Sequence, residues 1–281
     1  MRGYGVIGIV ALSAMASADA PKDVGAAVAK VIRASARDKA PDVSAALIKK
    51  PVIMTADGGA SAVLPHSREL FGADSGEAQL EPGTPTIVVG DHYAWFHVVV
   101  DASYVLELMN SDGPNRKRDH AALRVSGIAV DDHGWKIAAM MFSNVISDKQ
   151  LYAGAQPDSK RPDSVDPRAT SPAADALAHW IYEGTLASHI GKNAVANGTA
   201  PAEVATGAAA PKLAHAWDGL KMWSSGLEAT TLAGGAVAFV QGTVFLPRPN
   251  GAVQLAIGAV LVHGDDGWRW VCLNFAPFLG A

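Results

Sequence analysis

A short segment that occurs twice constrains this chain more than any other feature. Asp131-Asp132-His133-Gly134-Trp135-Lys136-Ile137 returns as Asp265-Asp266-Gly267-Trp268-Arg269-Trp270, and an apolar run leads into each copy. Turns rich in aspartate and glycine between apolar runs are a strong hairpin signal. Each copy therefore predicts a hairpin turn that leads into the last strand of a folded unit.

The segments that precede the two turns also repeat in order. Ala238-Phe239-Val240-Gln241 aligns with Ala94-Trp95-Phe96-His97 at an offset of 144 residues, and Asn197-Gly198 takes the place of Asp57-Gly58. A length of 281 residues fits domains of roughly 100 to 150 residues. We therefore predict a domain at residues 21–150 and a second domain at residues 173–281.

Two segments are predicted to lie outside these domains. In residues 1–20, Arg2 precedes an apolar run that ends in small residues, which is the pattern of a signal peptide. The run is too short to cross a bilayer of roughly 30 Å as a helix. We therefore expect export to the periplasm or the medium after cleavage, and no membrane span in the mature protein. Residues 151–172 contain four prolines among polar residues, as a linker does.

Composition argues against several classes of ligand and partner. The formal net charge is −4, and the basic residues are scattered except at Arg116-Lys117-Arg118, so we expect no nucleic-acid partner. The single cysteine, Cys272, permits no intramolecular disulfide and is expected to be a small buried side chain. Neither metal-ligand spacing nor a phosphate-binding or dinucleotide motif is present, so we expect no metal and no cofactor.

Local patterns predict the individual elements. Residues 22–37 have the apolar spacing of an amphipathic helix, and residues 202–217 are predicted to be a second helix in the C-terminal unit. Pro41 is expected to start a further helical piece through Leu47. Residues 111–120 are polar and are predicted to be a long hairpin loop.

The order of elements, with its two Gly-Trp endings, resembles the NTF2-like superfamily, and in particular its SnoaL-like branch, in two tandem copies. The resemblance implies an α+β fold of two cone domains. In each cone, N-terminal helices wrap a curved antiparallel sheet around a cavity. Single-domain relatives commonly dimerise through their sheets, so the resemblance also implies an internal pseudo-dimer within a monomeric chain. The histidines expected after the tryptophan are missing, because Ala139 and Met141 stand at those positions.

Candidate site residues follow from the two-residue period of the strands. Tyr93, Trp95 and His97 share one face of a strand. His97 is the one titratable side chain at a strand position that is predicted to face the interior. We predict a non-catalytic protein that holds a small, mostly apolar molecule in a domain cavity. The predicted ligand contacts are Tyr93, Trp95, His97, Met141, Phe239, Gln241 and Asn274.

Two other functions stay open. An isomerase, dehydratase or cyclase would use His97 as its base. A scaffold would fill its cavities with its own side chains. An empty cavity of about 300 Å³ or more favours a binding protein, and a filled one favours a scaffold. A carboxylate within hydrogen-bonding reach of His97 in a pocket favours an enzyme.

Overall fold

The structure is a computed structural model that describes most of the chain. The predicted signal peptide lies almost wholly outside the described residues, as do Asp57-Gly58 and much of the predicted linker. No helix among the described residues has both the length and the hydropathy that crossing a bilayer requires. The described ranges are 19–37, 41–55, 60–71, 78–110, 113–146, 155–156, 160–166, 171–249 and 251–277.

The N-terminal elements form one mixed sheet, here called sheet A, with strand order β2-β1-β7-β6-β5-β3 and with β4 also paired to β5. Helix α1 precedes it in the chain, and β1 runs parallel to β7. The elements are α1 (Ala20–Ala34), η1 (Ser44–Ala46), β1 (Leu47–Met54), β2 (Ala60–Ser61), α2 (Ser67–Phe71), β3 (Gln79–Pro82), β4 (Thr86–Val89), β5 (Tyr93–Asn110), β6 (Gly113–Asp131) and β7 (Trp135–Asn144).

The C-terminal elements form a second mixed sheet, here called sheet B, with the order β10-β9-β14-β13-β12-β11 and with β8 paired to β13. Strand β9 runs parallel to β14, as β1 does to β7. The elements are β8 (Ala155–Gln156), α4 (Pro172–Glu183), η2 (Leu186–His189), β9 (Ile190–Asn197), β10 (Val204–Thr206), η3 (Gly207–Ala209), α5 (Ala210–Asp218), β11 (Trp223–Leu232), η4 (Ala233–Gly235), β12 (Val237–Arg248), β13 (Gly251–Gly264) and β14 (Gly267–Pro277).

The two sheets share one strand order, and this suggests two domains. The predicted α+β class is confirmed, since each sheet is preceded by helices. Both predicted turns join the last two strands of a sheet, β6 to β7 and β13 to β14. Each sheet departs from a purely antiparallel arrangement at one parallel pair, because its first long strand lies beside its last.

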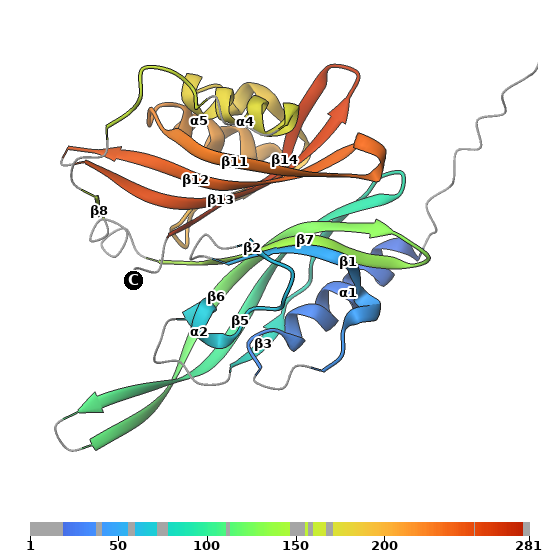
Figure 1. Cartoon of the computed structure of the whole chain (residues 1–281), viewed down its shortest axis with the longest axis vertical. Helices are drawn as coiled ribbons and strands as arrows, with labels where there is room; N and C mark the ends of the chain where they lie inside the picture. The colour runs from blue at the N-terminus through green and yellow to red at the C-terminus, as the bar shows by residue number, and fades with distance from the viewer. Residues whose placement is uncertain are drawn as a thin grey trace, which may run out of the picture.

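The helices cover the outer faces of the two sheets (Figure 1). Helix α1 buries Val24, Val28, Val31 and Ile32 against the core of sheet A, which explains the predicted apolar stripe. Helix α4 begins where the Ser171 side chain accepts a hydrogen bond from the Ala174 N–H. The cores of the two units therefore lie between helices and sheet.

The inner faces of the sheets pack against each other (Figure 1) and form a third core, here called the contact layer. Its side chains are apolar except for a few polar groups considered below. Because helices cover the other face, β7 and β14 are buried on both sides along most of their length. The contact layer consists of Met54, Trp95, Ile128, Ala139, Met141, Val195, Val237, Phe239, Ala256, Val260, Val271, Cys272 and Ala276.

The structure differs from the prediction at three elements. Leu47 starts β1 rather than ending a helix, and Pro51 lies where the pairing of β1 with β7 shifts register, a place where a strand tolerates proline. Residues 204–206 form β10, so the helix predicted at 202–217 is limited to α5 and a preceding 3-10 turn. Strand β11 was not predicted.

The predicted loop at residues 111–120 is instead part of a long two-stranded hairpin. Strands β5 and β6 remain paired from Tyr93 and Val130 to Asn110 and Gly113. Strand β3 pairs with β5 only as far as Ser103, and β7 pairs with β6 only as far as Leu123. The outer part, residues 104–110 and 113–122, projects from sheet A and is here called the arm (Figure 1).

Candidate functional site

The predicted site residues lie on the inner faces of the two sheets. In sheet A, His97, Ser126, Met141 and Met54 are paired in turn across β5, β6, β7 and β1. In sheet B the equivalent row across β12, β13, β14 and β9 is Gln241, Gly258, Asn274 and Asn197. Trp95 and Phe239 belong to the contact layer, and Tyr93 packs against it. The structure thus brings the predicted residues together between the sheets.

The two rows lie against each other with their residues in opposite order. Asn197 Nδ2 lies 3.4 Å from His97 Nδ1, and Asn274 Nδ2 donates to Ser126 Oγ over 2.6 Å. A side chain at Gly258 would overlap Met141. The first residue of the sheet A row therefore contacts the fourth residue of the sheet B row. The second residue of the sheet A row contacts the third of the sheet B row, and the third contacts the second. Contacts of this kind relate two surfaces by a twofold axis.

His97 is buried in this layer as a neutral imidazole. It is 5% exposed, and its pKa is lowered from 6.5 to about 4, first by burial and then by the positive charge of Arg124. Its hydrogen-bond partner is the amide of Asn197, which cannot take up a proton as a carboxylate does. The arrangement holds His97 in place but does not prepare it to act as a base near neutral pH.

Cys272 is also a structural residue of the contact layer. It is 1% exposed, and burial raises the pKa of its thiol to about 12, although a hydrogen bond with Ser126 acts in the opposite direction. A thiol with so high a pKa forms almost no thiolate and is a poor nucleophile. The expected small, buried cysteine is what the structure contains.

Arg124 links the two sheets. It lies on β6, is 2% exposed, and reaches the loop that joins β9 to β10. Nη1 donates to the carbonyl of Gly198 at 2.6 Å and Nη2 to that of Ala200 at 2.7 Å, with longer bonds to Pro201 and Glu203. Within this loop Glu203 Oε2 accepts the N–H groups of Thr199 and Ala200. One guanidinium therefore binds four carbonyl oxygens of the other sheet's loop.

The same loop forms one wall of a cavity of about 200 Å³ between α5 and sheet B. The rest of its lining is mainly apolar. None of the seven predicted ligand contacts lines this cavity. Its lining residues are Gly198, Thr199, Glu203, Trp217, Leu220, Met222, Leu246, Arg248, Leu255 and Phe275.

Sheet A has a different residue at the position equivalent to Arg248. Counting from His97 and Gln241, which are equivalent in the two rows, Tyr104 corresponds to Arg248. The ring of Tyr104 stacks on Phe71 with centroids 4.3 Å apart. Arg248 instead lines the cavity of sheet B. The two units therefore differ at this position.

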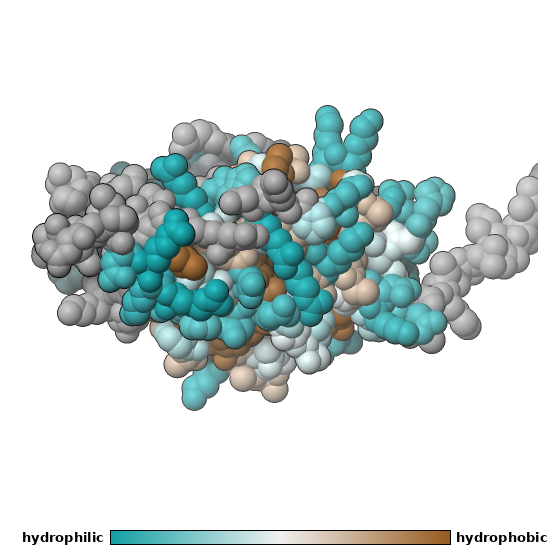
Figure 2. All heavy atoms as spheres, turned by 90° about the horizontal axis from the view of Figure 1, so that it is seen from below, coloured by the Kyte–Doolittle hydropathy of each residue, from teal (hydrophilic) through white to brown (hydrophobic). Residues whose placement is uncertain are grey.

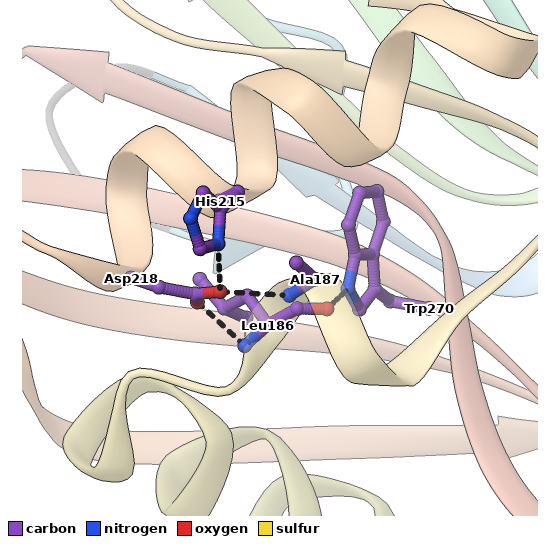
Figure 3. Close-up of polar contacts among 5 residues, drawn as sticks. All are labelled: Leu186, Ala187, His215, Asp218 and Trp270. Atoms are coloured by element: carbon purple, nitrogen blue, oxygen red, sulfur yellow. Dashed lines mark hydrogen bonds and ion pairs between the residues drawn. The ribbon is translucent and has the colours of Figure 1, made fainter.

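A polar network holds α5, which carries the cavity residue Trp217 (Figure 3). Asp218 at the end of α5 accepts the N–H of Leu186 at 2.7 Å and that of Ala187 at 3.3 Å. Trp270 Nε1 donates to the carbonyl of Leu186 at 2.8 Å. His215 lies 4.0 Å from Asp218 and its side chain is 85% exposed, so this His–Asp pair is a helix-end contact and not a catalytic dyad.

Replacing Asp218 by alanine is expected to reduce the free energy of unfolding by about 2 kcal/mol, because two backbone N–H groups lose a charged acceptor. Urea unfolding monitored by circular dichroism measures the change. Asp101→Ala, at an exposed position of β5, is the control and should alter stability by less than about 0.5 kcal/mol. Equal losses in the two variants would contradict a structural role for the Asp218 network.

Two other hollows are less suited to a ligand. A hollow of about 90 Å³ lies by β1 and β2 and includes Ile53, Thr55 and Glu69. A groove of about 380 Å³ lies between residues 160–166 and β11, but it is more open to solvent than the cavity beside α5. Among the described residues no three His, Cys, Asp or Glu side chains are grouped to hold a metal ion. The cavity beside α5 is therefore the candidate site.

Sequence reasoning missed this cavity because its lining residues have the appearance of core. One available signal was Arg124, a lone charge within the apolar run Leu123–Val130. A buried arginine requires acceptors, so its position indicated a contact between units.

No known family profile matches the chain, and no curated protein is similar to it in sequence. Several solved structures are similar to parts of it. An NTF2-like superfamily protein from Salmonella enterica has 14% identity over 47% of this chain and 96% of that one, with a TM-score of 0.33. An NTF2-like protein with a cystatin-like fold from Novosphingobium aromaticivorans has 18% identity over 38% and 78%, with a TM-score of 0.29. An NTF2-like protein involved in plasmid conjugation has 8% identity over 72% and 78%, with a TM-score of 0.23.

Proposed function

We propose that this protein binds a small, mostly apolar molecule, without catalysis, in the cavity between α5 and sheet B. The cavity itself carries the proposal, because Trp217, Leu246 and Phe275 supply an apolar lining and the loop after β9 supplies polar groups. Binding sites for small molecules commonly combine an apolar wall with a few polar groups. The proposed site therefore differs from the one expected from the sequence, although the class of ligand is the same.

The volume limits the size of the ligand. A closed apolar cavity of roughly 150 Å³ holds benzene, and drug-sized ligands occupy roughly 300 Å³ or more. At about 200 Å³ the cavity is smaller than the roughly 300 Å³ expected from the sequence analysis for a binding pocket. It has room for a single ring system or a short branched chain. We therefore propose one-ring or two-ring apolar compounds and medium-length alcohols as the ligand class.

A binding role is favoured over an enzyme that uses His97. The imidazole is buried between the sheets, its pKa is lowered to about 4, and its partner is an amide. No described residue places a carboxylate in hydrogen-bonding contact with it. The lowered pKa would leave His97 a weak base at neutral pH.

We further propose that the chain is a monomeric internal pseudo-dimer of two NTF2-like units, of the SnoaL-like branch, that is exported after removal of a signal peptide. The crossed rows of His97 and Asn197, and of Ser126 and Asn274, support the internal pairing. Sedimentation of the mature protein should give one species of about the chain mass at all concentrations. A concentration-dependent dimer would contradict this proposal.

Ligand binding is expected to disappear when the cavity is filled. Indole and n-hexanol serve as probes, and a probe at 100 times its Kd should stabilise the wild type by about 2.7 kcal/mol, or roughly 5 °C in Tm. Leu246→Trp adds an indole ring at the cavity wall and should abolish both the thermal shift and the calorimetric binding signal. Val99→Trp, at a residue that is 48% exposed, is the matched control and should bind like the wild type.

The experiment also separates a binding protein from a scaffold. If neither probe nor any member of a lipophilic compound library shifts the Tm of the wild type, the scaffold function would replace the proposal. Binding that survives in Leu246→Trp but is lost in a His97→Gln variant would place the ligand between the sheets instead.

A further inference from the structure

The arm is a part of the molecule that ligand binding does not explain. Beyond Ser103 and Leu123 it is a ribbon of two strands, and no other described strand pairs with it there. An isolated two-stranded ribbon is only marginally stable in water. The arm would therefore gain stability from a partner that pairs with one of its edges.

The equivalent hairpin of sheet B shows what such a partner does. Strands β12 and β13 end at Arg248 and Gly251, and near this end β8 pairs with Ala252 and Val253 of β13. No described strand occupies the corresponding edge of β6 between residues 113 and 122. Among the described residues, sheet A thus presents an open strand edge where sheet B has a covered one.

The charge on this edge is positive, whereas the chain as a whole carries a formal charge of −4. Arg116, Lys117 and Arg118 are consecutive and exposed, and Asp119 is half-buried. Lys117 is paired with Leu106 and Arg118 with Val105, so these two charges stand opposite apolar residues, whereas Arg116 is paired with Glu107. The face of the molecule from which the arm projects is largely hydrophilic (Figure 2).

Basic residues on an edge strand discourage pairing with neutral or basic strands, and this prevents aggregation. The same charges favour a strand of opposite charge, since opposite-charge pairs across neighbouring strands stabilise a sheet. An edge that is both open and basic therefore selects its partner by charge. Two copies of the arm would bring like charges together, which argues against pairing with a second copy of this chain.

We propose that β6 of the arm, at residues 115–122, binds an extended acidic segment of a partner protein, which adds to this edge as another strand. Backbone hydrogen bonds supply the affinity in this mode of recognition, and side chains supply the specificity. Acidic residues at alternate positions of the partner would lie beside Arg118 on one face, or beside Lys117 on the other. The proposal is independent of the ligand cavity.

A fluorescein-labelled peptide of nine alternating glutamates and threonines tests the proposal on the full chain, with a lysine–threonine peptide as its counterpart. Fluorescence anisotropy should detect binding of the acidic peptide only, and the Kd should rise with salt. Lys117→Glu/Arg118→Glu should weaken binding at least tenfold. Lys49→Glu/Lys50→Glu makes the same change of charge at exposed residues of β1 and should change the Kd less than twofold.

Two further measurements keep the outcome decisive. Amide hydrogen exchange at residues 115–122 should slow when the acidic peptide binds, as strand addition requires. A chain in which Asn-Gly replaces residues 105–118 removes Lys117 and Arg118 but keeps the paired residues Tyr104 and Asp119. It should keep sheet A and lose binding, which covers the case in which the charge variant fails to fold. Absence of binding, equal loss in the control variant, equal affinity for duplex DNA or anionic vesicles, or self-association through the arm would each overturn the proposal.

Discussion

Replacing Arg124 by methionine is expected to reduce the free energy of unfolding by about 3–5 kcal/mol, as removal of one partner from a buried charged contact usually does. The guanidinium holds four carbonyl oxygens of the loop that follows β9. Without it the buried carbonyl of Gly198 and the partly buried carbonyls of the other three residues lose a donor. A buried group left without a partner costs about 1–3 kcal/mol. Chemical denaturation followed by tryptophan fluorescence measures the loss.

Matched variants separate this contact from a general effect of charge. Arg118→Met removes an exposed arginine from the same strand and should change stability by about 0.5 kcal/mol or less. Arg124→Lys keeps the positive charge but lacks the planar guanidinium that can donate to several carbonyls at once. It is expected to retain only part of the stability that Arg124→Met loses. If Arg124→Met costs less than about 1 kcal/mol, the contact does not join the two sheets in the way described.

The second large effect concerns pH. The folded-state pKa of His97 is about 4 and its ordinary value is 6.5, so the unfolded chain takes up a proton first as the pH falls. Above pH 6.5 the group contributes no pH dependence. From 6.5 down to about 4 the protein should lose about 1.4 kcal/mol per pH unit, and about 3 kcal/mol in total, after which the contribution is constant.

His97→Gln is expected to remove this part of the acid sensitivity, because glutamine does not titrate. Gln241 stands at the equivalent position of sheet B, so a glutamine side chain is accommodated at this place in the strand. Urea unfolding of both proteins between pH 7.5 and 4.5 should give curves that diverge towards low pH. His120→Gln, at an exposed position of β6, should follow the wild type. Parallel curves for the wild type and His97→Gln would show that His97 is protonated equally in the folded and unfolded states.

The strand pattern of residues 93–101 was a reliable guide because it depends only on period and burial. Trp95 lies in the contact layer, and Phe96 and Val98 lie in the core beneath α1, as alternation requires. The two turns could also be predicted, since aspartate and glycine favour that geometry locally. These features need no knowledge of distant contacts.

The open cavity could not be predicted in the same way. Leu246, Leu255 and Phe275 have the pattern of core residues, and whether core residues leave a space depends on volumes contributed from α5 and the loop after β9. The arm was missed for a related reason. Residues 113–120 are polar, and their pairing with β5 depends on register across the hairpin rather than on an apolar period.

The crossed rows have a consequence for how the protein can change during evolution. In a dimer of identical chains a substitution beside the axis appears twice, so a buried arginine would have to be accommodated on both sides. Here Arg124 of β6 has Ala256 as its counterpart on β13, by the same spacing that relates Ser126 to Gly258. A single polypeptide can thus carry a charged anchor on one side of its pseudosymmetric core and a methyl group on the other, leaving each unit free to specialise.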